Sequence, residues 1–436
     1  MEISKKVLII TYYWPPSAGS GVQRWLKFAK FLPEYGWEPV IFTPENPDFE
    51  LKDETMLKEV SPNWEVIKFP IWEPYGVFRF LKKKKKGKAE DPSKLIEKRH
   101  KNWFDQTSIW LRANAMIPDP RVFWVKPSVN YLLDIVEKNS IQAIITTGPP
   151  HSMHLIGRDL KRKSGLPWIA DFRDPWSTWE FLDTLPMMKS IRRRHERLEQ
   201  SVFREADKVV TISPTFQEEL AKIAHREIDL ITNGFDSADL PKDFQKKKSE
   251  SPVFEIVYTG IIDAIRNPIP FLNAFKQAFE PMEKAVKLTF VGRVSEKVSH
   301  FVKEDPWLAE RVDFPGYVPH EKVFAFYEKA NMLLLILTNT KNAKGNIPGK
   351  LFEYIATGRT IVALGDPLGD ASKIIQEAEA GKVFSHESVD EIQAYLEQQI
   401  MEDVKSTTSS SIDHFERKYL SQKLAQLLDE NSNSLS

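Results

Sequence analysis

The chain has 436 residues, a length that suggests two or three domains, each large enough to bury a core. Its 61 Lys and Arg residues equal its 61 Asp and Glu residues, so no global positive charge would recruit nucleic acid, and we expect no nucleic-acid partner. Cys is absent, which excludes disulfides, thiolate zinc sites and a Cys nucleophile.

The first apolar run of the chain is too short for a signal peptide. Val7–Ile10 is apolar, but Trp14, Pro15 and Pro16 follow it closely, and no small-residue cleavage site comes next. No other stretch is long enough to span a bilayer, since the apolar run Met332–Leu337 has the length of a buried strand. We therefore expect a cytoplasmic location, with at most peripheral contact at the inner face of the cell membrane.

The first half of the chain alternates short apolar runs with amphipathic stretches. Val7–Ile10 leads through a loop with Gly19 and Gly21 to the amphipathic stretch Val22–Tyr35, which Gly36 ends. This order predicts a βαβ unit with parallel strands. The alternation continues through further predicted strands and one predicted helix: strands Val40–Phe42, Ala143–Thr147, Trp168–Ala170, Val209–Ile212 and Leu230–Thr232, and the helix His151–Lys163.

A polar, Lys-rich segment at 242–251 predicts a linker, after which a second series of βα units begins. Its expected strands are Ile256–Thr259, Leu288–Val291, Leu333–Leu337 and Ile361–Leu364, and its expected helices include Phe271–Phe279, Glu321–Lys329 and Lys350–Thr357. We predict an α/β protein with two facing Rossmann-like domains and an active site in the cleft between them, because such sheets bind ligands beyond the carboxyl ends of their strands. The expected bounds are 1–245 and 246–405, and 406–436 should supply a helix that packs back on the first domain.

In the second half of the chain, two loops that follow predicted strands each contain a glycine and a basic residue. In the first, Gly260 permits a close approach, Arg266 offers a fork of donors, and a helix beginning near Pro268 presents free N–H groups to a phosphate. A surface turn with a solvated Arg is the alternative. In the second, Gly349 opens a helix and places Lys350 in its first turn, where a cation opposes the helix dipole and requires a nearby anion.

Glu353 lies one turn after Lys350 and suits a bidentate hydrogen bond to ribose hydroxyls; an exposed charged pair is the alternative. A third segment, Phe314–Val318, is predicted as a turn whose backbone, at Val318, could meet a nucleobase edge.

The first half offers two histidines and a charged run as further candidates. His151 follows a predicted strand, and His154 shares its helix face; a structural role for either is the alternative. No carboxylate or Cys at ligand spacing supports a metal site there, so we expect none. Asp171 and Arg173 follow another strand end, and their opposite charges could instead brace one another.

The sequence resembles glycosyltransferase family 4 over nearly its whole length. The residues that carry the resemblance are Tyr12–Pro16 with Gly19–Gly21, Trp168–Trp176, Ala206–Ser213, Asn233–Asp236, Tyr258–Gly260 and Pro348–Tyr354. The resemblance implies the GT-B fold, retention of the donor's anomeric configuration, an acceptor-side N-terminal domain and a C-terminal domain that binds the nucleotide sugar.

The resemblance also implies roles for single residues of the donor site. Gly19 and Gly21 should approach the donor phosphate or the acceptor, while Arg266 and Lys350 contact the pyrophosphate. Glu353 matches the later glutamate of the family's paired-glutamate motif and should hold the ribose. The earlier glutamate would fall near Gly345, where there is no carboxylate, so the backbone of Asn346–Gly349 should take over that contact with the sugar.

On the acceptor side, the resemblance implies that His151 contacts the donor sugar or the reacting centre, with His154 less directly involved, and that Asp171 and Arg173 line the acceptor. The expected donor is a UDP- or GDP-linked sugar, with no cofactor or metal. The expected acceptor is a glycan or a lipid-linked molecule, as in the synthesis of cell-envelope polysaccharide. Fixed cations would stabilise the departing diphosphate, one of whose oxygens takes the acceptor's proton.

The segment Lys82–Lys86 is either a solvated loop or part of a surface that rests on anionic lipid together with nearby aromatic residues. Those aromatic residues are Trp103, Phe104, Trp110, Phe123 and Trp124.

A nucleotide-sugar epimerase of the same fold and a non-catalytic nucleotide-binding module remain alternatives. A dehydrogenase is disfavoured, because the run from Gly19 to Gly21 lacks the third glycine of a dinucleotide-binding loop and the acidic ribose residue after the next strand.

Overall fold

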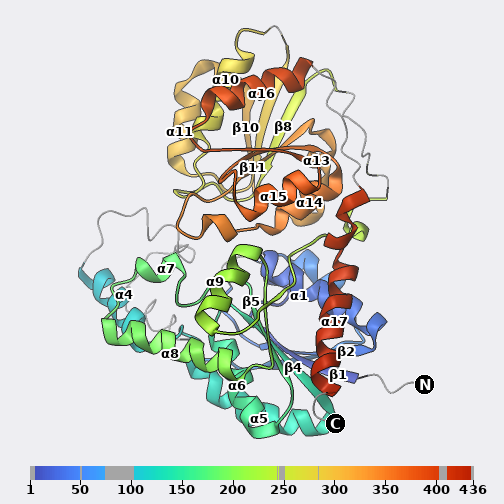
Figure 1. Ribbon diagram of the computed structural model, residues 1–436. Helices are drawn as coiled ribbons and strands as arrows, with labels where there is room; N and C mark the ends of the chain where they lie inside the picture. The colour runs from blue at the N-terminus through green and yellow to red at the C-terminus, as the bar shows by residue number, and fades with distance from the viewer. Residues whose placement is uncertain are drawn as a thin grey trace. The chain divides into compact units, whose positions relative to one another are not determined.

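The computed structural model describes residues 5–49, 52–73, 103–242, 244, 251–282, 284–401 and 410–433. The chain forms two compact units (Figure 1): unit 1 is Met1–Thr232 with Arg417–Ser436, and unit 2 is Asn233–Glu416. These bounds differ from 245 and 405, the limits expected from the sequence. The difference arises because Phe235 and Phe415 both pack in a core of unit 2, where the backbone at Phe235 bridges that at Glu416.

Unit 1 is built on a seven-stranded parallel sheet in the order β3-β2-β1-β4-β5-β6-β7. Its strands are β1 (Lys5–Ile10), β2 (Trp37–Pro44), β3 (Glu65–Phe69), β4 (Ile141–Gly148), β5 (Trp168–Phe172), β6 (Lys208–Thr211) and β7 (Asp229–Leu230). Its helices include α1 (Ser20–Phe31), α4 (Trp103–Ala115), α5 (Val122–Lys138), α6 (Ser152–Ser164), α7 (Glu180–Asp183), α8 (Lys189–Glu205), α9 (Pro214–Ala224) and α17 (Arg417–Asn433).

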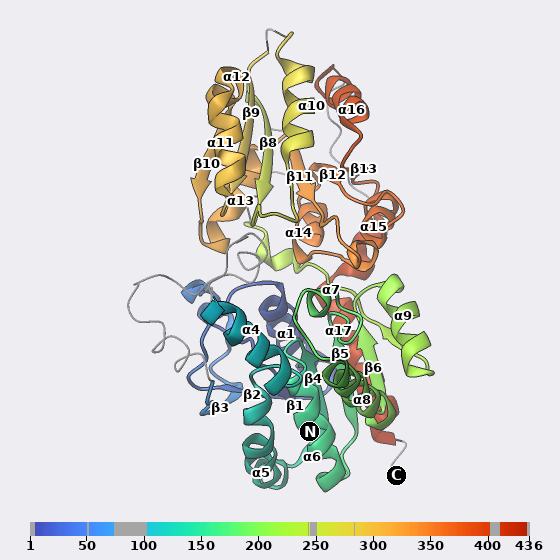
Figure 2. The ribbon, with the colours of Figure 1, turned by 90° about the vertical axis from the view of Figure 1, so that its left-hand side faces the viewer.

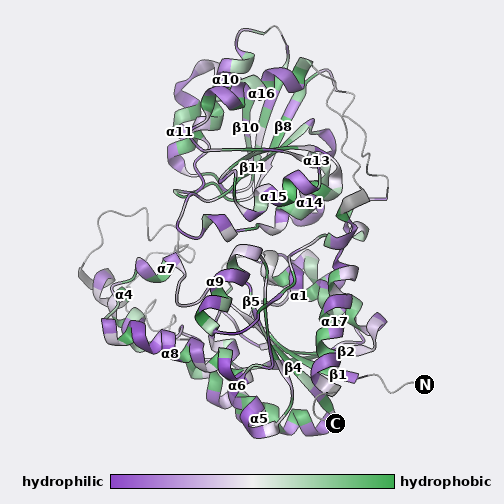
Figure 3. Cartoon of the chain, in the orientation of Figure 1, coloured by the Kyte–Doolittle hydropathy of each residue, from purple (hydrophilic) through white to green (hydrophobic). Residues whose placement is uncertain are grey.

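Helices cover both faces of this sheet, which explains why its strands read as continuous apolar runs. Side chains alternate between the faces: Leu8 and Ile10 pack in one core, while Val7 and Ile9 pack in the other. Figure 3 shows the apolar residues on the strands and the polar ones on the outer helix surfaces.

The C-terminal helix α17 completes the second of these cores. Leu420, Leu424 and Leu428, spaced one helical turn apart, pack in the same core as Val7 and Ile9. Near the end of the helix, Asp429 accepts a hydrogen bond from Lys5 Nζ at 2.7 Å. The end of the chain therefore belongs to unit 1.

Unit 2 has a six-stranded parallel sheet in the order β10-β9-β8-β11-β12-β13, visible from one edge to the other in Figure 2. Its strands are β8 (Phe254–Thr259), β9 (Val286–Val291), β10 (Val312–Gly316), β11 (Met332–Ile336), β12 (Thr360–Leu364) and β13 (Gly381–Phe384). Its helices include α10 (Ile269–Phe279), α11 (Glu296–Glu304), α12 (Pro306–Arg311), α13 (His320–Lys329), α14 (Gly349–Thr357), α15 (Asp370–Glu377) and α16 (Val389–Met401).

Counted from its own first strand, unit 2 has the order 3-2-1-4-5-6 of a Rossmann sheet, and the first six strands of unit 1 have the same order. The predicted α/β fold class is therefore confirmed. One prediction was wrong: Phe314–Gly316, expected as part of a turn, belongs to β10. A proline is tolerated there because β10 lies at the edge of the sheet.

Candidate active site

The candidate donor site lies in unit 2, where the order of its sheet reverses between β8 and β11. Ligands of Rossmann sheets bind beyond the carboxyl ends of the strands at this point. Strand β8 ends at Thr259 and is followed by Gly260, while the loop after β11 leads to Asn346 and then to α14. The predicted donor residues of both loops therefore come from the two elements that flank the reversal.

Lys350 is a half-buried lysine whose ammonium group lies at the end of β8. Its Nζ donates to the backbone oxygen of Thr259 at 2.7 Å and lies 3.9 Å from the centroid of the Tyr258 ring. Desolvation and then the nearby guanidinium of Arg266 lower the pKa of Lys350 to about 7, against the opposing charges of Glu353 and Asp263. An anion bound here would relieve the repulsion between the two cations.

Gly260 permits this arrangement. A Cβ at Gly260 would lie 3.1 Å from Lys350 Nζ, and the backbone at this position has a φ of 123°, which side-chain-bearing residues rarely adopt. The glycine thus leaves space beside the ammonium group for a ligand.

Arg266 is held by a carboxylate of its own loop. Its Nη1 donates to Asp263 Oδ2 at 2.7 Å, and its backbone N–H donates to Asp263 Oδ1 at 3.1 Å. The Arg266 side chain is 31% exposed, whereas that of Asp263 is only 9% exposed. Asp263 therefore anchors the guanidinium while leaving part of it accessible.

Glu353 stands on α14, one turn after Lys350, and is half-buried. Its Oε1 is 3.1 Å from Nε2 of His320, and its Oε2 is 3.5 Å from the hydroxyl of Tyr327. The charges of both Arg266 and Glu353 act on the Lys350 ammonium, so the three predicted groups interact electrostatically. Sequence reasoning missed His320; the only signal for it was a histidine at the start of a predicted helix, directly after Pro319.

The wall behind these groups is a hydrogen-bonded cluster at the end of β8. The Tyr354 hydroxyl accepts from the Thr259 backbone N–H at 3.0 Å, and the Tyr327 hydroxyl is 3.0 Å from Thr259 Oγ1. These bonds fix α13 and α14 against the strand.

The remaining predicted donor residues of unit 2 have separate places in the loops. Asn346 Nδ2 donates to Thr338 Oγ1 at 3.1 Å, which ties together the loop between β11 and α14, and Gly349 is the first residue of α14. Val318, half-buried, lies between β10 and α13 and packs against the same core as α14.

In unit 1 the candidate residues gather beyond the ends of β1, β4 and β5. A Cβ at Gly21, in the first turn of α1, would lie 1.9 Å from Arg173 Nη1, so only glycine allows this approach. Arg173 also donates through Nη2 to the backbone oxygen of Pro149 at 2.6 Å. Gly19 is the N-cap of α1, and its carbonyl accepts from the N–H of Val22 at 3.0 Å.

Asp171 does not brace Arg173, contrary to the alternative considered from the sequence. Its carboxylate, 2% exposed, accepts from Arg24 Nη2 at 2.9 Å, from Trp25 Nε1 at 3.0 Å and from Thr147 Oγ1 at 2.9 Å. These bonds join α1 to β4 and β5. The carboxylate is thus engaged in the interior, although it was predicted to line the acceptor.

His151 and His154 are both buried, and burial lowers the pKa of each, for His154 to about 3. His154 Nδ1 is 2.9 Å from Thr146 Oγ1, and its ring stacks on Phe172. The His151 ring stacks on Trp176 at 4.9 Å, and burial keeps it neutral although a hydrogen bond with the Pro175 backbone favours its charged form. His151 is therefore a neutral, stacked ring, and His154 has a structural partner in Thr146.

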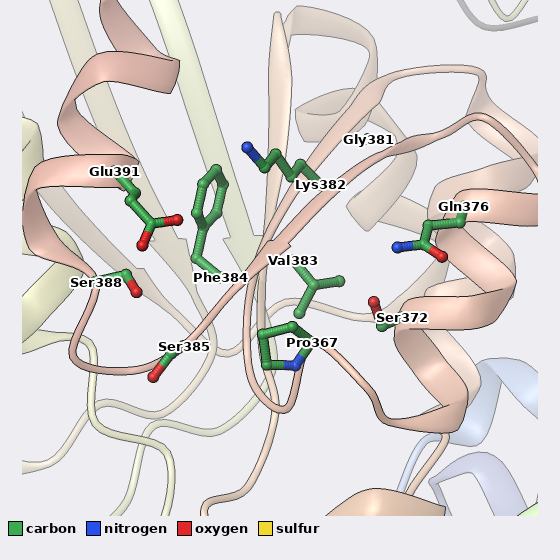
Figure 4. Close-up of a pocket in the computed structure, with 10 residues that line it drawn as sticks. All are labelled: Pro367, Ser372, Gln376, Gly381, Lys382, Val383, Phe384, Ser385, Ser388 and Glu391. Atoms are coloured by element: carbon green, nitrogen blue, oxygen red, sulfur yellow. The ribbon is translucent and has the colours of Figure 1, made fainter.

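A separate pocket of unit 2 includes none of the predicted site residues. It has a volume of about 320 Å³ and lies against the edge strand β13, between α15 and α16 (Figure 4). Pro367, Ser372, Ser385 and Glu391 are among the residues that line it.

Within the described ranges, no helix is long and apolar enough to cross a membrane. The Lys82–Lys86 segment lies outside the described residues, as do the side chains of Trp103 and Phe104. Trp110 and Phe123 are exposed, but Trp124 is not: it stacks on Phe42 at 4.9 Å in the core of unit 1.

Comparisons with known proteins agree with this fold. Residues 254–402 match the family model described as "Glycosyl transferases group 1", and no curated protein matches the sequence. Among solved structures, sucrose-phosphate synthase from Thermosynechococcus elongatus has a TM-score of 0.63 and 15% identity, covering 99% of this chain and 100% of that one.

Two further solved structures match over similar lengths. Anabaena HepE in complex with UDP and glucose has a TM-score of 0.61 and 14% identity, covering 98% of this chain and 99% of that one. The lipopolysaccharide outer core galactosyltransferase WaaB has a TM-score of 0.59 and 13% identity, with coverage of 98% and 99%. Residues 254–402 thus form a group 1 glycosyltransferase domain, in a chain with the GT-B glycosyltransferase fold.

Proposed function

We propose that the protein is a retaining glycosyltransferase that moves a sugar from a UDP- or GDP-linked donor to a glycan or lipid-linked acceptor in cell-envelope polysaccharide synthesis. One observation carries the proposal: Arg266 follows β8, and Lys350 and Glu353 lie on α14 after β11, so all three come from the elements at the sheet reversal of the group 1 domain. Structural neighbours solved with UDP and with UDP-glucose support a nucleotide-sugar donor.

In the proposed reaction these groups stabilise the departing diphosphate. As the bond between the anomeric carbon and the donor's phosphate oxygen breaks, negative charge grows on the diphosphate. Arg266, Lys350 and the N-terminus of α14 stabilise that charge from fixed positions. The acceptor hydroxyl attacks the anomeric carbon from the same face, which retains the configuration, and its proton passes to a diphosphate oxygen. The scheme assigns no step to a metal or a protein base.

Unit 1 supplies the proposed acceptor-side groups. Arg173 and the start of α1 at Gly19 and Gly21 offer hydrogen-bond donors, and the neutral His151 ring, stacked on Trp176, is the proposed neighbour of the donor sugar. In this proposal Asp171 acts indirectly, by holding α1 in place through Arg24.

The first experiment identifies the donor and then tests Arg266. Thermal unfolding with UDP-glucose, UDP-galactose and GDP-mannose selects the nucleotide sugar that stabilises the protein. With that donor, Arg266→Ala should lower turnover by about 10²-fold, more than it weakens donor binding. Arg311→Ala is the matched control, since its side chain is equally exposed at 31% and packs over Trp307. Unchanged turnover in Arg266→Ala would remove the diphosphate clamp from the mechanism.

The same assay distinguishes the proposed transferase from a nucleotide-sugar epimerase. An epimerase would interconvert the free nucleotide sugar without any acceptor, whereas the proposed transferase needs one. Bound donor with neither transfer nor interconversion would indicate a nucleotide-binding module.

We further propose peripheral contact of unit 1 with anionic lipid. Trp110 and Leu111 are exposed on α4, and Asn114 of α4 accepts from the Met188 backbone N–H at the start of α8 at 2.9 Å. The neighbouring α8 carries the exposed basic residues Lys189, Arg193, Arg194 and Arg197. Cosedimentation with phosphatidylglycerol vesicles should exceed that with phosphatidylcholine vesicles and should fall in a Trp110→Ser variant. Equal binding to both vesicle types would contradict the proposal.

A further inference from the structure

His320 contacts the carboxylate of Glu353, which the sequence analysis expects to hold the donor's ribose. It is the first residue of α13, and its Nε2 is 3.1 Å from Glu353 Oε1 on the neighbouring α14. The edge of its ring packs against Phe324 one turn later, with centroids 5.5 Å apart and planes at 79°. Its side chain is 28% exposed, so the imidazole is fixed from two sides but remains accessible.

The same helix provides the second contact of this carboxylate. Tyr327, two turns after His320 on the same face of α13, has its hydroxyl 3.5 Å from Glu353 Oε2. Each carboxylate oxygen therefore faces one group of α13. In the proposed function this same carboxylate meets two adjacent hydroxyls, those of the donor's ribose.

Without these contacts Glu353 would have a competing partner. Lys350 precedes it by three residues, at a spacing that brings side chains together on a helix, and the charge of Glu353 already acts on the Lys350 ammonium. A carboxylate that turned toward Lys350 would neutralise the cation proposed for the diphosphate and would present a different edge to the ribose.

We infer that His320 is a positioning residue that orients the Glu353 carboxylate for the two ribose hydroxyls and thereby determines selectivity for ribonucleotides. This inference rests on the proposed function and adds a residue to it. A purely structural role, in which the bond between His320 and Glu353 only joins α13 to α14, predicts lower stability but no change in selectivity.

The experiment compares two ligands across a set of variants. Calorimetry measures the Kd of the nucleoside diphosphate chosen by the thermal screen and that of its 2′,3′-dideoxy analogue. His320→Phe keeps the ring packing on Phe324 but removes the polar contact with Glu353, and His320→Gln restores a donor. His300→Ala is the matched control, because His300 makes a similar contact to Glu304 at 3.0 Å on the exposed surface of α11.

We expect the wild type to prefer the ribonucleotide by about tenfold or more, as expected for hydrogen bonds to a charged carboxylate. That preference should shrink toward one in His320→Phe and in Glu353→Gln, and combining the two changes should shrink it no further. It should recover in His320→Gln and stay at the wild-type value in His300→Ala.

An unchanged preference in a folded His320→Phe protein would overturn the inference while leaving the proposed function intact. Should the wild type bind neither ligand, the proposed function itself fails and the inference fails with it. Circular dichroism and thermal unfolding of each variant establish that it is folded, so the two failures stay distinct.

Discussion

Lys350 gives the protein a pH dependence that follows from its burial. Its pKa is about 7 in the ligand-free protein, because burial and Arg266 disfavour the charged form. A bound diphosphate favours that form and raises the pKa toward the ordinary lysine value. The ligand therefore binds the protonated protein more tightly, and its affinity is greatest below pH 7.

The expected magnitude follows from the size of the shift. Above pH 7 the affinity should fall about tenfold for each pH unit until the pKa of the bound state is reached, and so by up to about 100-fold between pH 7 and pH 9. UDP-glucose is a better probe than UDP, because the terminal phosphate of UDP titrates near pH 6, as phosphate monoesters do. Binding at pH 8 should take up nearly one proton per ligand.

Calorimetry in buffers with different ionisation enthalpies measures both the affinity and the proton uptake. Lys350→Arg should bind with an affinity that hardly varies with pH, since a guanidinium stays charged throughout, and Lys350→Met should bind weakly at every pH. The exposed Lys297 of α11 provides the control, because Lys297→Met should keep the wild-type profile. A wild-type affinity that stays constant from pH 6 to pH 9, without proton uptake, would show that Lys350 does not become protonated when the ligand binds.

Two further predictions concern unit 1. Arg24→Met removes the partner of the buried Asp171 and should lower the free energy of unfolding by about 3–5 kcal/mol, as measured with urea. The exposed Arg162 is the control, since Arg162→Met should cost only about 0–1 kcal/mol. Gly21→Ala places a Cβ 1.9 Å from Arg173 Nη1, so the guanidinium must move. We expect the unfolding midpoint to stay near the wild-type value. The rate of sugar transfer in a steady-state assay should fall about tenfold or more, because a group that positions the substrate is displaced. A wild-type rate of transfer would show that the position of Arg173 is unimportant.

The sequence predicted the sheets well because their strands are buried on both faces. The run Val7–Ile10 stays apolar at every position, since alternate residues enter two different cores. The place of Lys350 at a helix start also led us to expect an anion beside it, which stays a prediction. The sequence could not predict that Tyr258 and the carbonyl of Thr259 hold the ammonium, because those residues are about ninety positions away in the chain.

Long-range contacts also explain what the sequence did not reveal. Asp171 is two residues from Arg173, but it pairs with Arg24, 147 positions earlier, because parallel strands bring β5 close to α1. Pro315 suggested a turn, but an edge strand has no partner on its outer side and accommodates a proline. His320 gave no pattern of its own, since its role depends on Glu353 of another helix.

The proposed function requires that Arg266, Lys350 and Glu353 bind one nucleotide sugar. A crystal structure with the donor chosen by the thermal screen would show whether they do. We expect diphosphate oxygens within hydrogen-bond distance of Arg266 and Lys350, and ribose hydroxyls on the carboxylate of Glu353. A donor bound away from these three side chains, for example in the pocket beside β13, would contradict this expectation.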